Sequence, residues 1–219
     1  YNKYLQGIDG KLLTETDLVG QELQNGAMSY ISAVDGLTVT LTIDAVIQTI
    51  VENVLQLAMH QQSPQGARCI VLDATTGEIL AMASKPSVDL NNLPRDDLET
   101  LMKYSKNTLL TDVYEPGSTF KLVTASAALE EKIAQVDKAG EFCCTGGIEV
   151  AGVRIKCWRY YRPHGSESLR QGLMNSCNPV FIGLGQKLGV HTYYQYLEKF
   201  GFLRKTGIDL PGEAGSIFL

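Results

Sequence analysis

Long apolar runs are missing from this sequence of 219 residues. A membrane-spanning helix needs about 18 or more consecutive apolar residues, and no stretch of the chain approaches that length. A secretory leader is not visible either, and the first residue is Tyr1 rather than Met. We therefore expect the chain to be a trimmed piece of a longer protein.

An excess of basic residues is missing too. The 24 Asp and Glu residues outnumber the 19 Lys and Arg residues, and the formal net charge is −5. Because proteins bind nucleic-acid phosphates through basic patches, this balance argues against nucleic acid as a partner. The hydrophobic content of 44% is that of an ordinary globular protein. The length suits one large domain, or one domain and part of another.

The number and spacing of the cysteines are not those of a disulfide framework. There are five, an odd number, and Cys143 and Cys144 are adjacent. A disulfide between neighbouring residues departs strongly from normal disulfide geometry. We therefore expect free thiols, or thiolates that bind a metal.

The hydrophobic pattern of the sequence changes near residue 36. Residues 1–36 are polar, with turn signals that include Asn25-Gly26, which is typical of a linker or the end of a non-catalytic N-terminal domain. Residues 37–219 have the apolar periodicity of a folded domain. Within them, residues 37–42 alternate like a half-buried strand, and Asp44 is placed to cap a helix that runs to about His60.

A strand hairpin and several helices are predicted further on. Residues 67–73 and 78–83 are two strands around a Thr-Thr-Gly turn, whereas residues 139–167 look irregular. Strands early and helices later indicate the α+β class. The predicted helices cover residues 96–104, 120–130, 169–174, 178–188 and 191–200.

Ser118 and Lys121 form the strongest chemical signal, in the segment Tyr114-Glu-Pro-Gly-Ser-Thr-Phe-Lys121. Pro116-Gly117 makes a turn, so Ser118 begins a helix whose positive end favours developing negative charge. Lys121 is one turn further on, which places its amine beside the Ser118 hydroxyl. An apolar helix lowers the pKa of such a lysine towards that of a usable base. Ser-x-x-Lys is the nucleophile motif of penicillin-binding proteins and β-lactamases.

A helix cap followed by a solvent-reaching lysine is the alternative for an isolated Ser-x-x-Lys. The surrounding sequence decides between the two readings. Glu115-Pro-Gly-Ser-Thr-Phe-Lys121, after the hairpin of residues 71–84, closely resembles class B penicillin-binding proteins of the division, elongation and sporulation type. The resemblance extends from Tyr4 to the Asp209–Glu213 loop and implies a transpeptidase fold with an antiparallel sheet and a helical subdomain.

Ser176-Cys177-Asn178 matches the second active-site element of that family, Ser-x-Asn. The resemblance implies that the Ser176 hydroxyl relays a proton between Lys121 and the leaving amine. It implies also that the Asn178 amide orients the substrate peptide. Asn178-Pro179 serves equally as an ordinary helix start, and both roles are compatible.

Lys205-Thr206-Gly207 has the letters of the family's third element, but we reject it. The resemblance implies a much longer stretch of sequence between the second and third elements than the one that separates Ser176 from Lys205. The flanking residues are those of a loop rather than of an alternating strand. The resemblance places a Thr-Gly-Ile-Asp-Leu-Pro-Gly-Glu loop here. We therefore expect the true third element and the last strands of the sheet to lie beyond this chain.

Cys143, Cys144, Cys157 and His164 gather in the irregular segment. Three thiolates and an imidazole are zinc ligands and would complete a tetrahedron that braces the loop. Adjacent cysteines would not readily both reach one ion, so the fourth ligand could be a carboxylate such as Asp137 or Glu141. Buried free cysteines beside a hydrogen-bonded histidine are the open alternative.

The resemblance implies a peptidoglycan D,D-transpeptidase that works through a Ser118 acyl-enzyme, needs no cofactor for catalysis and is inhibited by β-lactam antibiotics. It implies a place on the extracytoplasmic face of the membrane, with a membrane glycosyltransferase as partner. The sporulation or division type of Gram-positive bacteria fits best. A serine β-lactamase and a non-catalytic scaffold or sensor with the same fold are the alternatives.

Overall fold

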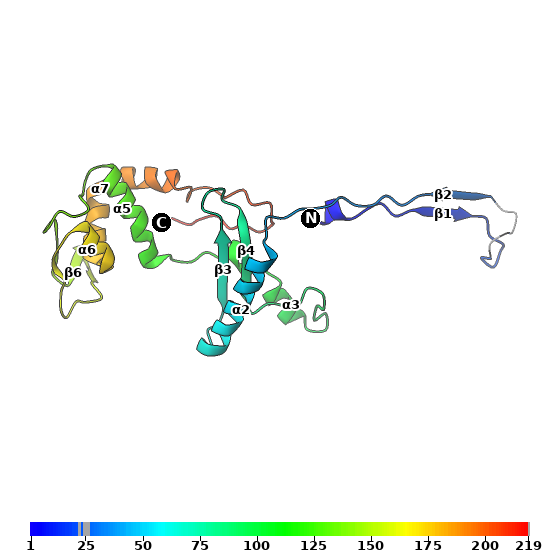
Figure 1. Ribbon diagram of the computed structural model, residues 1–219, viewed down its shortest axis with the longest axis horizontal. Helices are drawn as coiled ribbons and strands as arrows, with labels where there is room; N and C mark the ends of the chain where they lie inside the picture. The colour runs from blue at the N-terminus through cyan, green and yellow to red at the C-terminus, as the bar shows by residue number, and fades with distance from the viewer. Residues whose placement is uncertain (22, 24–26, 219) are drawn as a thin grey trace. The chain divides into compact units, whose positions relative to one another are not determined.

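The computed structural model describes residues 1–21, 23 and 27–218 (Figure 1). They form two compact units, Tyr1–Ser87 and Val88–Leu219. The division into a linker (residues 1–36) and a transpeptidase domain (residues 37–219) stays a prediction. The turn expected at Asn25-Gly26 lies outside the described residues. Among the described helices, none has the length and apolarity needed to cross a membrane.

The first unit begins with a short helix and an exposed hairpin. α1 spans Asn2–Leu5, and β1 (Lys11–Thr14) pairs with β2 (Met28–Ile31) in antiparallel register. Nearly all side chains of these strands are exposed, so the hairpin has little core of its own.

The rest of this unit is one helix packed on one hairpin. α2 spans Ala45–Gln62, and the Asp44 carboxylate accepts hydrogen bonds from the first helical amides, as predicted. β3 (Ala67–Leu72) and β4 (Ile79–Lys85) pair antiparallel, which confirms the predicted hairpin. Figure 1 shows α2 beside these strands, and its apolar face contributes to their shared core. That core contains Val51, Leu55, Ala81 and Ala83.

The strand predicted over residues 37–42 is wrong. This segment finds no ladder partner among the described residues, and Leu37 is 66% exposed. It is tied to the start of β4 by single bonds, from the Thr42 hydroxyl to the Ile79 carbonyl and from the Asp44 amide to the Leu80 carbonyl. Alternation predicts a strand only where a neighbouring strand is available to pair with it.

The second unit is built around two helices that pack against each other, α5 (Lys121–Glu130) and α7 (Asn178–Lys199). α7 joins the two helices predicted over residues 178–200, with a break at Gly189 where φ is +74°. α6 (Leu169–Met174) agrees with its prediction, and α3 (Leu98–Tyr104) with that for residues 96–104. The remaining helices are α4 (Thr108–Thr111) and the 3-10 helix η1 (Gly117–Phe120).

Four short strands occupy the segment predicted to be irregular. β5 (Phe142–Cys144) pairs with β8 (Gly165–Glu167), and β6 (Gly147–Val150) pairs with β7 (Val153–Lys156), both antiparallel. Strands of three or four residues are too short to show a period in the sequence. Phe142 and Cys144 of β5 join the buried side chains of α5, α6 and α7 in one core. Helices together with antiparallel strands confirm the α+β class.

Candidate active site and cysteine cluster

Ser118 lies on the 3-10 turn that leads into α5. Gly117, just before it, has a φ of +59°, a left-handed conformation that glycine adopts without a steric penalty. Lys121 opens α5 and is only 9% exposed. Its Nζ lies 3.3 Å from the Oγ of Ser118, so the turn brings together the two residues of the predicted motif.

Ser176 reaches the same place from the connection between α6 and α7. Its φ is +47°, a left-handed conformation that commonly follows the end of a helix and here lies just beyond α6. Two hydrogen bonds hold the turn, from the Ser176 amide to the Leu173 carbonyl and from the Cys177 amide to the Gly172 carbonyl. As a result the Ser176 Oγ lies 2.9 Å from the Ser118 Oγ.

Lys121 is the hub of a hydrogen-bond network. Its Nζ donates to the Ser176 carbonyl at 2.7 Å, to the Ser176 Oγ at 2.8 Å and to the Asn178 Oδ1 at 2.8 Å. The Asn178 Nδ2 donates in turn to the Lys156 carbonyl at 3.4 Å, which fixes the orientation of the amide. The structure therefore unites all four predicted residues, Ser118, Lys121, Ser176 and Asn178, in one network.

The protonation state of the Lys121 amine decides whether this network can accept a proton. Burial lowers the pKa of the Lys121 amine below its ordinary value of 10.5, because the charged form loses hydration. The Ser176 carbonyl and the Asn178 Oδ1 can only accept hydrogen bonds. A neutral amine has two protons, and these two acceptors engage both. Its lone pair is then left facing the hydroxyls of Ser118 and Ser176, where it can take a proton.

An open hollow of about 230 Å³ adjoins these groups. Its polar lining includes Lys121 and Asn178, and its apolar lining includes Phe120, Ile155 and Phe181. Apolar walls with a few convergent polar groups are typical of a ligand site. A larger hollow of about 480 Å³ lies near the end of α7 and has none of the four network residues in its lining. We therefore take the smaller hollow as the candidate substrate site.

Lys205-Thr206-Gly207 lies in a loop, as predicted. The Thr206 amide donates to the Glu213 carboxylate at 2.7 Å, and Gly207 has a φ of +84°. Residues 204–218 form turns and loop without strand pairing. This segment therefore lacks the strand that the third element requires.

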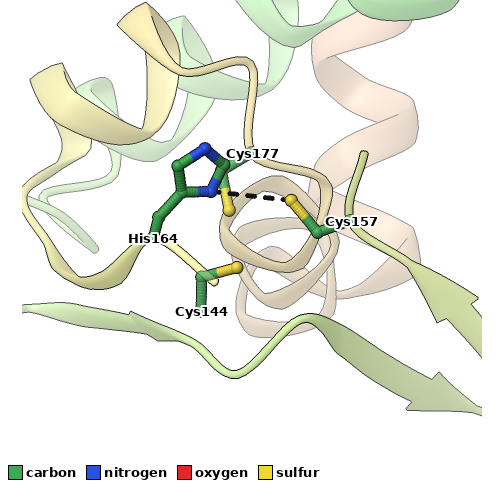
Figure 2. A group of neighbouring side chains, drawn as sticks. All are labelled: Cys144, Cys157, His164 and Cys177. Carbon is green, nitrogen blue, oxygen red and sulfur yellow. Dashed lines mark hydrogen bonds between the residues drawn. The ribbon is translucent and has the colours of Figure 1, made fainter. Parts of the chain in front are cut away.

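The cysteine cluster differs from its prediction in one member. The ligand atoms of Cys144, Cys157, His164 and Cys177 all lie within 4.8 Å of one another (Figure 2). The His164 Nδ1 faces the Cys157 Sγ at 3.5 Å. The prediction of Cys143 in this set is wrong, because Cys143 is exposed and its place is taken by Cys177. Neighbouring residues of a strand point to opposite faces, so only one of Cys143 and Cys144 can face inwards.

The carboxylates considered as a fourth ligand have other partners. Asp137 forms a paired hydrogen bond with the Arg170 guanidinium. Glu141 accepts a hydrogen bond from the Gln135 amide and lies 3.9 Å from the Lys138 amine. Neither residue belongs to the cluster.

The pKa values of two thiols of the cluster are shifted in opposite directions. Burial acts to raise the pKa of Cys144, but hydrogen bonds from the Gly146 and His164 backbones outweigh it and lower that pKa to about 7. Burial raises the pKa of Cys177 well above the ordinary value. A thiol that is half ionised near neutral pH is a ready metal ligand, because thiolates rather than thiols bind metals.

Sequence reasoning missed Cys177 and Glu167. Cys177 lies outside the irregular segment that contains the other three residues of the cluster, so the sequence relates it only to Ser-x-Asn. Glu167 carried no signal, although it is 2% exposed and therefore an unusual carboxylate. The sequence signal that could have placed Cys177 in the cluster is its residue type, which it shares with Cys144 and Cys157.

Comparisons with known proteins agree with this geometry. The family described as the penicillin binding protein transpeptidase domain matches residues 67–218. Stage V sporulation protein D of Bacillus subtilis (strain 168) is 38% identical over 217 residues, which are 99% of this chain and 33% of that protein. The chain thus spans about one third of the length of this curated relative.

Solved structures show the same fold. Penicillin binding protein 2X from Streptococcus thermophilus is 29% identical, with a TM-score of 0.81 over 100% of this chain and 32% of that chain. Penicillin binding protein 3 from Mycobacterium tuberculosis, complexed with ampicillin, is 33% identical, with a TM-score of 0.74 over 84% of this chain and 39% of that chain. The predicted transpeptidase fold is confirmed. This chain belongs to the penicillin-binding protein transpeptidase family, with the class B members that its motifs resemble.

Proposed function

We propose that the protein is a peptidoglycan D,D-transpeptidase with Ser118 as its nucleophile. One observation supports this above the others: a serine, a lysine, a second serine and an asparagine from two separate segments share one hydrogen-bond network. That arrangement provides a nucleophile, a base and a proton relay at contact distance. The family match points in the same direction.

Acylation follows from the proton positions. The Ser118 Oγ attacks the carbonyl of the penultimate D-alanine of a stem peptide, and its proton moves to neutral Lys121, directly or through the Ser176 hydroxyl. The tetrahedral intermediate collapses, the peptide bond breaks, and the proton passes to the nitrogen of the departing D-alanine. The product is an ester between Ser118 and the stem peptide.

Deacylation reverses the proton path with a different nucleophile. The amine of a neighbouring stem peptide attacks the ester carbonyl and gives a proton to Lys121. The ester bond breaks, an amide crosslink forms, and the proton returns to the Ser118 Oγ. These steps use side chains of the protein and no cofactor.

Asn178 has a binding role in this scheme. Its side chain lines the hollow beside Lys121, so it can hydrogen-bond to the backbone of a bound stem peptide. The bond to the Lys156 carbonyl keeps it oriented before the substrate arrives. A peptide held in this way would present its carbonyl to Ser118 without further rearrangement.

β-Lactam antibiotics would act as mimics of that peptide. Attack of Ser118 on the strained amide opens the ring and leaves an ester that hydrolyses slowly. Changes around the hollow would then alter susceptibility and provide a route to antibiotic resistance. The ampicillin complex of the Mycobacterium tuberculosis protein supports this extension.

The cellular setting is proposed from the resemblance. A peptidoglycan crosslinking enzyme works on the extracytoplasmic face of the membrane, where its substrate lies. An anchor in the full-length protein and a membrane glycosyltransferase that supplies glycan strands would complete the assembly. The similarity to a stage V sporulation protein favours a role in spore or division peptidoglycan.

Crosslinking by the full-length protein tests the function. Peptidoglycan strands with pentapeptide stems are supplied, and D-alanine and crosslinked dimers are measured for the wild type and for Ser118→Ala. We expect both products from the wild type alone, with Ser126→Ala as the control because its hydroxyl is on the exposed side of α5. Rapid turnover of penicillin without dimers would indicate a β-lactamase, and neither activity would indicate a scaffold.

A further inference from the structure

Four ligating side chains from four segments of the chain meet in the second unit. Cys144 ends β5, Cys157 follows β7, His164 precedes β8, and Cys177 joins α6 to α7. Figure 2 shows their thiols and imidazole gathered around one point, and the ligand atoms lie within 4.8 Å of one another. The three cysteines are no more than 1% exposed. Segments that approach from different directions can surround an ion, which residues on one strand cannot.

Two buried polar atoms without a hydrogen-bond partner in the described part of the chain give a second, independent indication of a cation site. Glu167 is buried beside the cluster, and its Oε2 lies 4.0 Å from the His164 Nδ1. Among the described residues, neither this oxygen nor the His164 Nε2 has a hydrogen-bond partner. Buried polar groups are almost always satisfied, and a buried carboxylate requires a compensating positive charge. A cation at the cluster would supply that charge.

Buried free thiols are the competing explanation. Cysteine packs well as a small apolar residue, and these three do belong to the core. That explanation accounts for the sulfur atoms but not for a buried imidazole and a buried carboxylate at the same point. A disulfide between two of the cysteines would provide no positive charge for the Glu167 Oε2, which has no hydrogen-bond partner among the described residues. A metal ion accounts for the three sulfur atoms, for the His164 Nδ1 that faces them and for the charge of the buried carboxylate.

We propose that Cys144, Cys157, His164 and Cys177 bind one Zn²⁺ ion. Three sulfur ligands and one imidazole nitrogen are a preferred set for zinc and complete its tetrahedral coordination. The Nδ1 of His164 is the ligand nitrogen, since it faces the sulfur atoms. Binding converts the three thiols to thiolates and releases their protons to solvent. With four protein ligands the ion has no open position, so its role is structural rather than catalytic.

The ion would also position the active site, a step that rests on the proposed function. Cys177 lies between Ser176 and Asn178, so a metal bond to its sulfur fixes the backbone from which both side chains project. Cys157 follows Lys156, whose carbonyl accepts the hydrogen bond of the Asn178 amide. Zinc would therefore hold in place both Asn178 and the Lys156 carbonyl to which it donates. It would also help to maintain the left-handed turn at Ser176. Cys177 is a positioning residue in this scheme.

Metal content of the full-length protein tests the site. Zinc is measured after purification without chelators, for the wild type and for Cys144→Ser, Cys157→Ser and Cys177→Ser. We expect one zinc per wild-type chain and loss of zinc in each variant. Cys143→Ser is the matched control, because this exposed cysteine is adjacent to Cys144 but outside the cluster. It should keep its zinc. A wild type without zinc, or folded cluster variants that retain it, would overturn the proposal.

The wild type provides a test that does not depend on variants that fold. Replacement of zinc by Co²⁺ should give the visible absorption bands of tetrahedral cobalt bound to thiolates. Bands of an octahedral, oxygen-bound cobalt would contradict the ligand set.

Acylation by a fluorescent penicillin then tests the positioning role. Removal of the metal by a chelator should slow acylation at least tenfold, and added Zn²⁺ should restore it. If metal removal leaves the rate unchanged, zinc does not position Ser176 and Asn178. If the protein binds zinc but is never acylated, the zinc site stands and the proposed transpeptidase function fails, so the two failures are distinguishable.

Discussion

Lys121 concentrates the chemistry of the site in one buried amine. Two of its contacts, to the Ser176 carbonyl and the Asn178 Oδ1, are with atoms that only accept hydrogen bonds. They orient the amine without competing for its lone pair. The two serine hydroxyls complete its surroundings, so the same atom can receive a proton from Ser118 and pass one to a leaving group.

Replacement of Lys121 by arginine separates charge from basicity. Arginine keeps the positive charge but does not lose its proton at any pH that proteins tolerate. We expect Lys121→Arg to acylate with penicillin about 10²–10⁴-fold more slowly, the usual contribution of a general base. The measurement is the rate of fluorescent penicillin labelling. A variant with the wild-type rate would show that positive charge alone is needed.

The pH dependence of acylation follows from the lowered pKa of Lys121. Burial disfavours the charged amine, so the neutral, basic form appears at a lower pH than for an exposed lysine. Acylation should therefore accelerate as pH rises, with a midpoint below 10.5. Stopped-flow labelling across pH gives this midpoint, and a rate that falls with rising pH would refute the assignment of Lys121 as base.

Asn178→Asp should move that profile in a known direction. The substitution keeps the shape of the side chain but places a negative charge where the Oδ1 now lies 2.8 Å from the amine. A carboxylate stabilises the charged amine and so raises the pKa of Lys121. The midpoint of acylation should shift to higher pH than in the wild type. An unchanged or lower midpoint would show that these two side chains do not share a proton network.

The sequence was sufficient to predict the four residues that share one hydrogen-bond network, but not the whole cysteine cluster. Ser118 and Lys121 are neighbours on one helical turn, so their spacing alone predicts contact. Ser176 and Asn178 required the family resemblance, because only tertiary packing brings their segment to Ser118. Cys177 was missed for the same reason: no local period relates it to the other ligands.

At the scale of elements, the close approach of α6 and α7 sets the position of Ser176. A Cβ on Gly172 would lie 2.8 Å from the Val180 Cγ1, closer than real side chains come. Val180 is stiff because it is β-branched, and it is 2% exposed, so it has little room to move. Glycine at this point allows the turn between the helices to be tight.

Gly172→Ala tests that contact against a matched substitution. Gly183→Ala, on α7, adds a methyl group with nothing within 4 Å, so only the gain in helix propensity applies. We expect Gly172→Ala to be less stable than Gly183→Ala by about 1–3 kcal/mol, the usual cost of overpacking. Urea unfolding of the two variants measures the difference. Equal stability would show that the helices separate at no cost.

The elements that were predicted well have long or distinctive patterns. α2 has 18 residues, with apolar positions at helical spacing and an N-terminal cap. The β3–β4 hairpin has a Thr-Thr-Gly turn between two apolar runs. The strands of residues 142–167 are too short for such a pattern, and tertiary packing determines them. The strand predicted over residues 37–42 failed for the opposite reason, since its pattern was clear but a pairing partner was not available among the described residues.

At the scale of the whole molecule, the chain belongs to the penicillin-binding protein transpeptidase family. The family match covers residues 67–218, which include the hairpin of the first unit and the candidate active-site residues of the second. The chain accounts for about one third of the curated relative's length. The proposed activity is therefore a property to be tested on the full-length protein.

The site of the covalent penicillin adduct tests the central claim most directly. The full-length wild type and Ser118→Ala are treated with penicillin, digested, and analysed by peptide mass spectrometry, with Ser126→Ala as the control. We predict a single stable adduct on Ser118 in the wild type and the control, and none in Ser118→Ala. An adduct on Ser176 or elsewhere, or a wild type that acquires none, would contradict the assignment of Ser118 as the nucleophile.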